Sequence, residues 1–190
     1  MINPPILSNP QLIDAALLPL QEKFKDCLSW LDNAYGRCER IPTDKAYRRF
    51  IPVVYAGNGA NKATERDYIE LFPSDTLGNF CFFTTQRANI DQLYTQPNVY
   101  FYDVGLIFWF DYRKVFGDDH LSNRTANVIT QVLELLDNST KIQLDNVEEE
   151  VPQIYSEFAY GSINSLFRER PYGCFRINFQ LKYQDLSCQQ

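Results

Sequence analysis

Side chains that could do chemistry are few in this sequence, and they are scattered. The chain has one histidine, His120, so any histidine-activated nucleophile or histidine-containing metal site must include it. Asp118 and Asp119 precede it, but adjacent side chains of a turn diverge, and no second histidine or cysteine stands at zinc-ligand spacing. The sequence therefore predicts a solvated turn here and no metal site.

The cysteines are odd in number and form no Cys-x-x-Cys pair of the kind that metal and redox motifs use. A pairing of Cys81 or Cys174 with His120 in space would make an enzyme, and this alternative stays open because such partners converge only in the fold. We otherwise expect reduced, mostly buried thiols. The five cysteines are Cys27, Cys38, Cys81, Cys174 and Cys188.

Asp103 and Asp111 are the best candidates for a general acid and base, because both lie in one aromatic run. Their separation of eight residues corresponds to about 26 Å in an extended strand. Two carboxylates so far apart cannot act on one substrate atom. We therefore predict that the chain has no catalytic site.

A glycine-rich segment follows the first apolar run and invites comparison with phosphate-binding loops. It lacks the Gly-Lys-Ser/Thr of a Walker A loop and the third glycine of a dinucleotide fingerprint. The segment has loop chemistry throughout, so we expect a projecting loop over 56–66 and no bound cofactor. The family resemblance described below makes Gly57, Asn58, Gly59, Asn61 and Lys62 candidate contacts with a neighbouring subunit.

Two small basic clusters are the other candidate contacts between subunits. Arg48 and Arg49 form one, and Arg168 and Arg170 form the other. Paired arginines of this kind are most simply explained as partners in salt bridges at the surface or between subunits.

Composition and charge limit the class of protein. The chain has 190 residues, of which 45% are hydrophobic and 22% charged, so we expect one globular domain over 1–190. The aromatic share of 15% is high enough to suggest an interface as well as a core. A net charge of −6 argues against a protein that binds DNA of any base sequence through its phosphates. The first nine residues resemble no secretory signal, so we expect an extended segment over 1–9 and synthesis in the cytoplasm.

Two amphipathic helices are predicted. The first follows Asn9-Pro10 and continues to Gly36, where Pro19 either kinks it or divides it into two helices. The second covers 126–136 and ends near Asn138.

Five strands are predicted, and their connections show no βαβ rhythm. Pro52 favours an edge position for the first strand, and Gly105 is a candidate bulge in the long central one. The last alternates apolar and polar residues strictly, which is typical of a half-exposed antiparallel strand. The fold class is therefore α+β, with a mostly antiparallel sheet of about five strands covered by the two helices. The strands lie over 50–55, 79–85, 99–115, 141–147 and 175–183.

The order of these elements supports a family resemblance. It rests on the N-terminal helix, the turn at Pro73 before 78–83, the strand 106–111, the helix after Thr125 and the closing strand 175–181. Together they resemble the neck proteins of tailed phages, namely head-to-tail connector, tail-terminator and ring proteins such as those of crAss-like phages. The resemblance covers most of the chain, although Pro19 departs from a continuous first helix.

This resemblance implies a structural subunit of a virion, repeated in a six- or twelve-fold ring beneath the portal. Such a ring joins the portal or head to the tail and lets genomic DNA pass through its lumen without sequence-specific binding. Its partners would be copies of itself and neighbouring portal, neck or tail proteins, with no membrane and no cofactor. A binding module for a small ligand or peptide remains the alternative, beside an enzyme that uses His120 or a cysteine.

Overall fold

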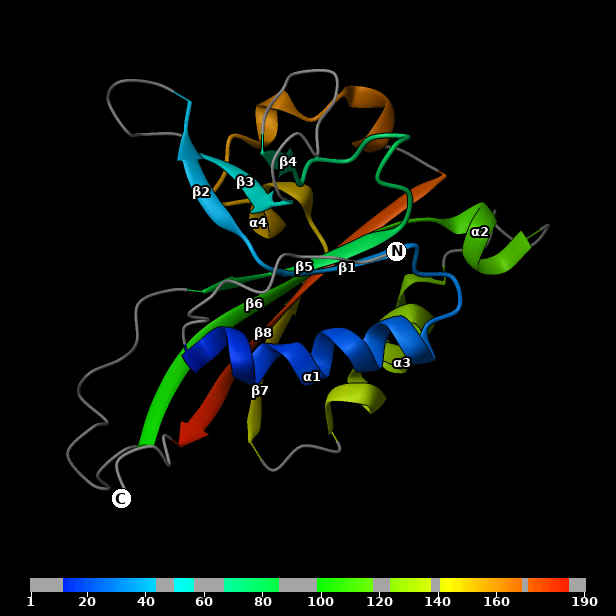
Figure 1. Ribbon diagram of the computed structural model, residues 1–190. Helices are drawn as coiled ribbons and strands as arrows, with labels where there is room; N and C mark the ends of the chain where they lie inside the picture. The colour runs from blue at the N-terminus through cyan, green and yellow to red at the C-terminus, as the bar shows by residue number, and fades with distance from the viewer. Residues whose placement is uncertain are drawn as a thin grey trace.

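The computed structural model describes residues 12–43, 50–56, 67–85, 99–117, 124–137, 141–168 and 171–184. Within these ranges the chain alternates helices and strands irregularly, so the predicted α+β class is confirmed. Figure 1 shows the central sheet between two layers, with helices on one side and a smaller sheet with short helical turns on the other.

The central sheet has five strands in the order β1-β5-β6-β8-β7. All neighbouring pairs are antiparallel except β1 and β5, which are parallel, so the sheet is mostly antiparallel as predicted. The strands are β1 (Asn33–Arg37), β5 (Phe80–Thr85), β6 (Val99–Asp111), β7 (Ile142–Glu148) and β8 (Tyr172–Gln184).

Two long helices cover one face of this sheet, namely α1 (Leu12–Cys27) and α3 (Thr125–Asp137). Their apolar faces meet alternate residues of β6 and β8, because successive side chains of a strand point to opposite faces. Phe24 of α1 packs edge-on against Phe108 of β6, and Phe108 stacks on Phe175 of β8. This first hydrophobic cluster confirms the predicted covering of the sheet by two helices.

A second hydrophobic cluster fills the other face. There the sheet is covered by the short helix α4 (Val151–Ile154), the 3-10 helices η3 (Tyr160–Ser162) and η4 (Ser165–Arg168), and a three-stranded sheet. The small sheet has the order β2-β3-β4. Its strands are β2 (Glu39–Pro42), β3 (Phe50–Tyr55) and β4 (Tyr68–Glu70). A further short helix, α2 (Tyr112–Phe116), follows β6 directly.

The structure corrects five local predictions. The strand predicted over 99–115 ends at Asp111, because the next residues form α2. The first helix ends at Cys27 and not at Gly36, which lies in β1, and it continues through Pro19 as one helix. Pro52 lies in β3, the middle strand of the small sheet, and not at an edge. The neighbouring strand β4 ends at Glu70. The carbonyl of Pro52 accepts a hydrogen bond from the backbone N–H of Leu71, the next residue. A missing N–H is tolerated at that position because the ladder stops there.

The other two corrections concern the central sheet. The β5–β6 and β6–β8 registers run without a shift through Gly105, so β6 has no bulge there. The last strand is antiparallel as predicted, but its polar side is exposed only towards the C-terminal end: Lys182 is exposed, whereas Arg176 is only 4% exposed. The expected extended segment 1–9 and the loop residues 57–66 lie outside the described residues.

Candidate functional site

Few of the contact residues predicted from the sequence fall in the described part of the chain. Arg168 is there, as the last residue of η4. The others lie outside the described residues, as does His120, so their roles remain predictions. These others are Gly57, Asn58, Gly59, Asn61, Lys62, Arg48, Arg49 and Arg170.

A polar cleft of about 460 Å³ lies on the face of the central sheet opposite α1 and α3. Three neighbouring strands form it: β6 and β8 supply the floor, and the edge strand β7 supplies one wall. Its lining is mainly carboxylates and amides, and its described residues include no histidine or cysteine. The lining includes Asp103, Gly105, Asp145, Asn146, Glu148, Arg176, Asn178 and Gln180.

The edge strand keeps its polar residues on the cleft side by means of a register shift. Leu144 lies opposite Phe179 and Asn146 lies opposite Asn178, so Asp145 is an extra residue between them. This irregularity shifts the alternation of faces along β7 by one residue. Gln143, Asn146 and Glu148 consequently face the cleft, whereas Ile142, Leu144 and Val147 lie in register with the helix side; Leu144 also borders the cleft.

A buried ionic network closes the inner end of the cleft. Arg176 donates from Nη2 to Oε1 of Glu157 at 2.8 Å and from Nη1 to the carbonyl of Ile154 at 3.3 Å. The other carboxylate oxygen of Glu157 accepts from Arg40 of β2. The side chains of Arg176 and Glu157 are 5% and 12% exposed, so this is a largely desolvated arrangement. It ties β8, the turn after α4 and the small sheet together.

The same arginine orients the amides of the cleft. Nε of Arg176 donates to Oδ1 of Asn178 at 2.7 Å, and Nδ2 of Asn178 then donates to Oδ1 of Asn146 at 2.6 Å. Nε2 of Gln180 donates to Oδ1 of Asp103 at 3.1 Å. These bonds fix the orientation of the side-chain amides of Asn146, Asn178 and Gln180. The second carboxylate oxygen of Asp103 has no hydrogen bond to another described residue.

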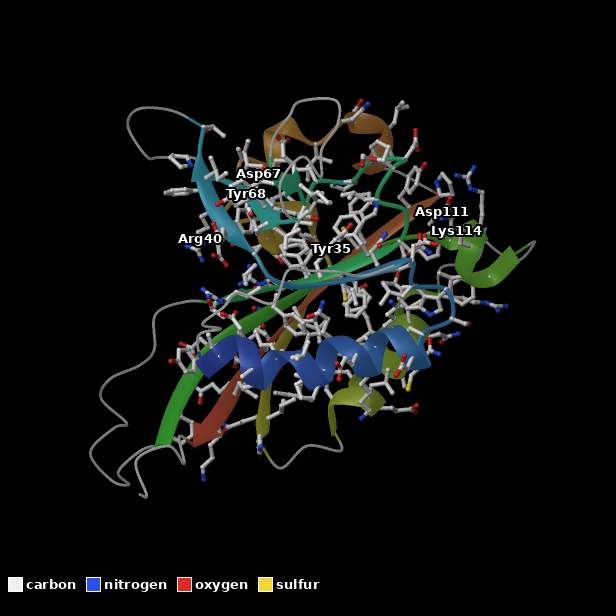
Figure 2. All side chains as sticks on the ribbon, in the orientation of Figure 1. Tyr35, Arg40, Asp67, Tyr68, Asp111 and Lys114 are labelled. Carbon is white, nitrogen blue, oxygen red and sulfur yellow. The ribbon has the colours of Figure 1, made fainter. Side chains whose placement is uncertain are left out.

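A second polar cluster lies at the far end of β6. Figure 2 shows Asp111 and Lys114 on the opposite side of the molecule from Arg40. Asp111 caps α2, accepting from the backbone N–H of Arg113 at 2.8 Å and from its Nη2 at 2.7 Å. Burial alone would raise the pKa of Asp111, but the hydrogen bonds and charge of Arg113 outweigh it and lower that pKa. Lys114 pairs with Asp32 at 2.7 Å. These contacts fix the start of α2 and form no site.

Large apolar side chains are exposed on both sides of the central sheet, and Ile41 of β2 is also 37% exposed. On the helix side, Leu144 of β7 is 42% exposed and Val147 is 38% exposed. On the other side, Leu166 of η4 is 72% exposed and Tyr160 of η3 is 39% exposed. In Figure 1, β7 lies at the lower edge of the central sheet and the two 3-10 helices lie above the small sheet.

The helix-side surface includes a groove. A cavity of about 280 Å³ lies between α1 and the start of β7, and its lining includes Pro19, Leu20 and Ile142. Leu18 on the adjoining turn of α1 is 42% exposed. We call this groove together with Leu18, Leu144 and Val147 the helix-side surface, and Tyr160 with Leu166 the 3-10 surface.

The buried thiols are poorly suited to nucleophilic catalysis. Burial raises the pKa of Cys38 and of Cys174 to about 12, and it raises the pKa of Cys81 further. A thiol attacks as its thiolate, so these three are protonated and inert near neutral pH. The predicted reduced and mostly buried state is confirmed for them, whereas Cys27 is free but exposed.

No protein-family model and no curated protein matches this chain. In the described part of the chain, no three His, Cys, Asp or Glu side chains lie close enough to hold a metal ion. No helix of those ranges is long and apolar enough to cross a membrane.

Proposed function

We propose that the protein is a structural subunit of an oligomeric ring in the neck or tail of a phage virion. In this role it joins the portal or head to the tail, and genomic DNA passes through the lumen of the ring. The phage assignment is supported by the order and character of the elements in the sequence. The ring is supported by the surface of the fold.

The observation that supports a ring is that the helix-side surface and the 3-10 surface are both apolar. They consist of different residues and lie on opposite faces of the central sheet. Ile142, beside the first surface, packs against the cluster under α1 and α3. Phe167, next to Leu166, packs against the cluster on the other face. A contact between two different patches of identical subunits is heterologous, and it gives a ring when the rotation closes.

The charge of the chain is compatible with this role. A net charge of −6 gives no general attraction for DNA, so a lumen formed by this chain would let DNA slide. The exposed leucines and Tyr160 can contribute to the apolar core of an interface.

The ring is tested with the full chain by analytical ultracentrifugation and negative-stain microscopy. The wild type is expected to form closed rings at high protein concentration. Leu144→Arg places a charge in the helix-side surface, and Leu166→Arg places one in the 3-10 surface. Each variant alone is therefore expected to be monomeric. Asn127→Arg adds the same charge at an exposed position of α3 outside both surfaces and is expected to assemble normally.

Mixing the two leucine variants distinguishes the type of contact. Each still carries the surface that the other lacks, so a heterologous contact predicts one-to-one heterodimers in the mixture. Two-fold dimers of the wild type, a wild type that stays monomeric, or no rescue in the mixture would contradict the ring. The phage assignment is tested separately by cryo-microscopy of the native particle, with a ring of this chain expected between head and tail.

A further inference from the structure

We propose that the extra residue in β7 protects the open edge of the central sheet, so that the sheet does not extend into a second copy of the chain. The inference concerns the backbone edge of β7 and does not rest on the ring.

The two edge strands of the central sheet differ in what covers them. In β1, the carbonyl of Ala34 accepts from Nε2 of Gln21 at 2.7 Å, so a side chain of α1 already uses this backbone acceptor. β7 is the other edge strand, and in the described part of the chain no strand pairs with its outer side. Five of its seven residues are exposed. An edge of this kind can pair with another chain unless something prevents it.

The outward backbone groups of β7 are unevenly spaced. The hydrogen bonds of an antiparallel ladder alternate, and Lys182 donates to the carbonyl of Lys141 at 2.7 Å. Ile142 and Leu144 therefore direct their backbone N–H and C=O groups away from β8. Beyond the register shift Val147 does so as well, because β8 itself is regular there. The outward groups are thus two residues apart and then three.

This spacing does not suit an added strand. A regular strand repeats its hydrogen-bonding groups every two residues, so it can pair with one half of β7 and is then out of step with the other. A bulge also bends its strand and increases the local twist, which turns an edge away from pairing. Asp145 adds a charge at the same place, and its side chain has no hydrogen bond or ion pair with another described residue.

The ladder between β7 and β8 does not need the extra residue. Without Asp145, Leu144 and Asn146 would be consecutive, and every pair that β7 makes with β8 would be retained. The strand would then read Ile-Gln-Leu-Asn-Val-Glu, which alternates apolar and polar residues and carries one charge. Short segments of high β-propensity and low charge are those that pair most readily between chains. Protection of the edge is therefore the role that we assign to the bulge.

Two deletions test this inference, both in the Leu166→Arg chain so that the proposed ring contact is disrupted. Deletion of Asp145 removes the bulge and the charge. Deletion of Asn146 removes the bulge and keeps the charge, because Asp145 would then lie opposite Asn178 and accept from its Nδ2 in place of Asn146. The matched control is Asp145→Asn, which keeps the bulge and removes the charge.

Sedimentation measures the mass of each variant relative to the Leu166→Arg parent. Both deletions are expected to give about twice the parent mass, because each chain has one open edge to share. Asp145→Asn is expected to keep the parent mass. Hydrogen exchange locates the contact, since the outward amides of Ile142, Leu144 and Val147 should exchange more slowly in the dimers than in the parent.

Unchanged mass in both deletions would overturn the inference, as would equal association of Asp145→Asn or unchanged exchange at the three outward amides. Loss of cooperative urea unfolding in both deletions would show that the fold itself requires the extra residue, and it would also overturn the inference. Rings of the wild type are measured separately, so failure of the proposed function and failure of this inference are distinguishable.

Discussion

The guanidinium of Arg176 lies over the backbone of Gly105. A Cβ on Gly105 would be 2.6 Å from both Nε and Nη2 of this arginine. Such distances are not compatible with a side chain, so the buried cation occupies the space that glycine provides. Gly105 thus has a packing role in a regular strand.

Replacing this glycine should disturb the network. Gly105→Ala is expected to lower the free energy of unfolding by about 1–3 kcal/mol, because the added methyl group must displace Arg176 or the strand. Urea unfolding followed by circular dichroism measures the change. Gly161→Ala is the control, since a Cβ there would meet no atom within 4 Å. Equal effects of the two substitutions would mean that Arg176 is free to move away.

Glu157 should be the most sensitive member of the ionic network. Glu157→Gln leaves Arg176 buried without its counter-charge and is expected to cost about 3–5 kcal/mol of stability. Arg40→Gln removes the outer partner, whose side chain is 38% exposed, and is expected to cost at most about 1 kcal/mol. Thermal and urea unfolding of both variants check the order. A larger loss for Arg40→Gln would place the main stabilising contact at the surface of the small sheet.

The elements that the sequence predicts are those with a long apolar period. The helix periods of α1 and α3 and the alternation along β6 and β8 each repeat over several turns or residue pairs, because one face of each element is buried. The three strands that were missed are short. They are β1, β2 and β4, and β4 has only three residues. Such strands exist through their pairing partners and carry little local signal.

The candidate site was largely invisible for the same reason. Arg176 follows Phe175 in an alternating strand, so its position predicts an exposed residue. It is buried because the turn after α4 covers that part of β8, and its partner Glu157 lies 19 residues away. The signal in the sequence that pointed to this site was Gly105, a glycine within an aromatic strand. The sequence suggests a bulge or a close approach there, and the close approach is what the fold contains.

Tyr155 offers a test of a buried group without a partner. Its hydroxyl is fully buried and makes no hydrogen bond to another described residue, whereas the hydroxyl of Tyr112 bonds to Thr125. Tyr155→Phe is therefore expected to raise the free energy of unfolding by about 1 kcal/mol. Tyr112→Phe, which removes the hydrogen bond to Thr125, is expected to lower it by about 1–2 kcal/mol. Urea unfolding compares the two, and a loss of stability in Tyr155→Phe would contradict the assignment.

The buried thiols should make the fold sensitive to alkaline pH. Burial raises the pKa of Cys38 and Cys174 to about 12 from 9.0, the value expected in the unfolded chain. Between these values the unfolded state has lost protons that the native state keeps, so the free energy of unfolding falls as pH rises. Below pH 9 the contribution of both thiols is fully present.

Substitution of the thiols separates this effect from that of other groups that ionise in the same range. Each buried thiol contributes a slope of up to about 1.4 kcal/mol per pH unit. Cys174→Ala is expected to be less stable than the wild type near neutral pH, because it leaves a small cavity, but its stability should fall less steeply above pH 9. Cys27→Ala, at an exposed position, should keep the wild-type slope. Urea unfolding at several alkaline pH values gives the slopes, and a Cys174→Ala slope equal to that of the wild type would show that this thiol ionises without opening the fold.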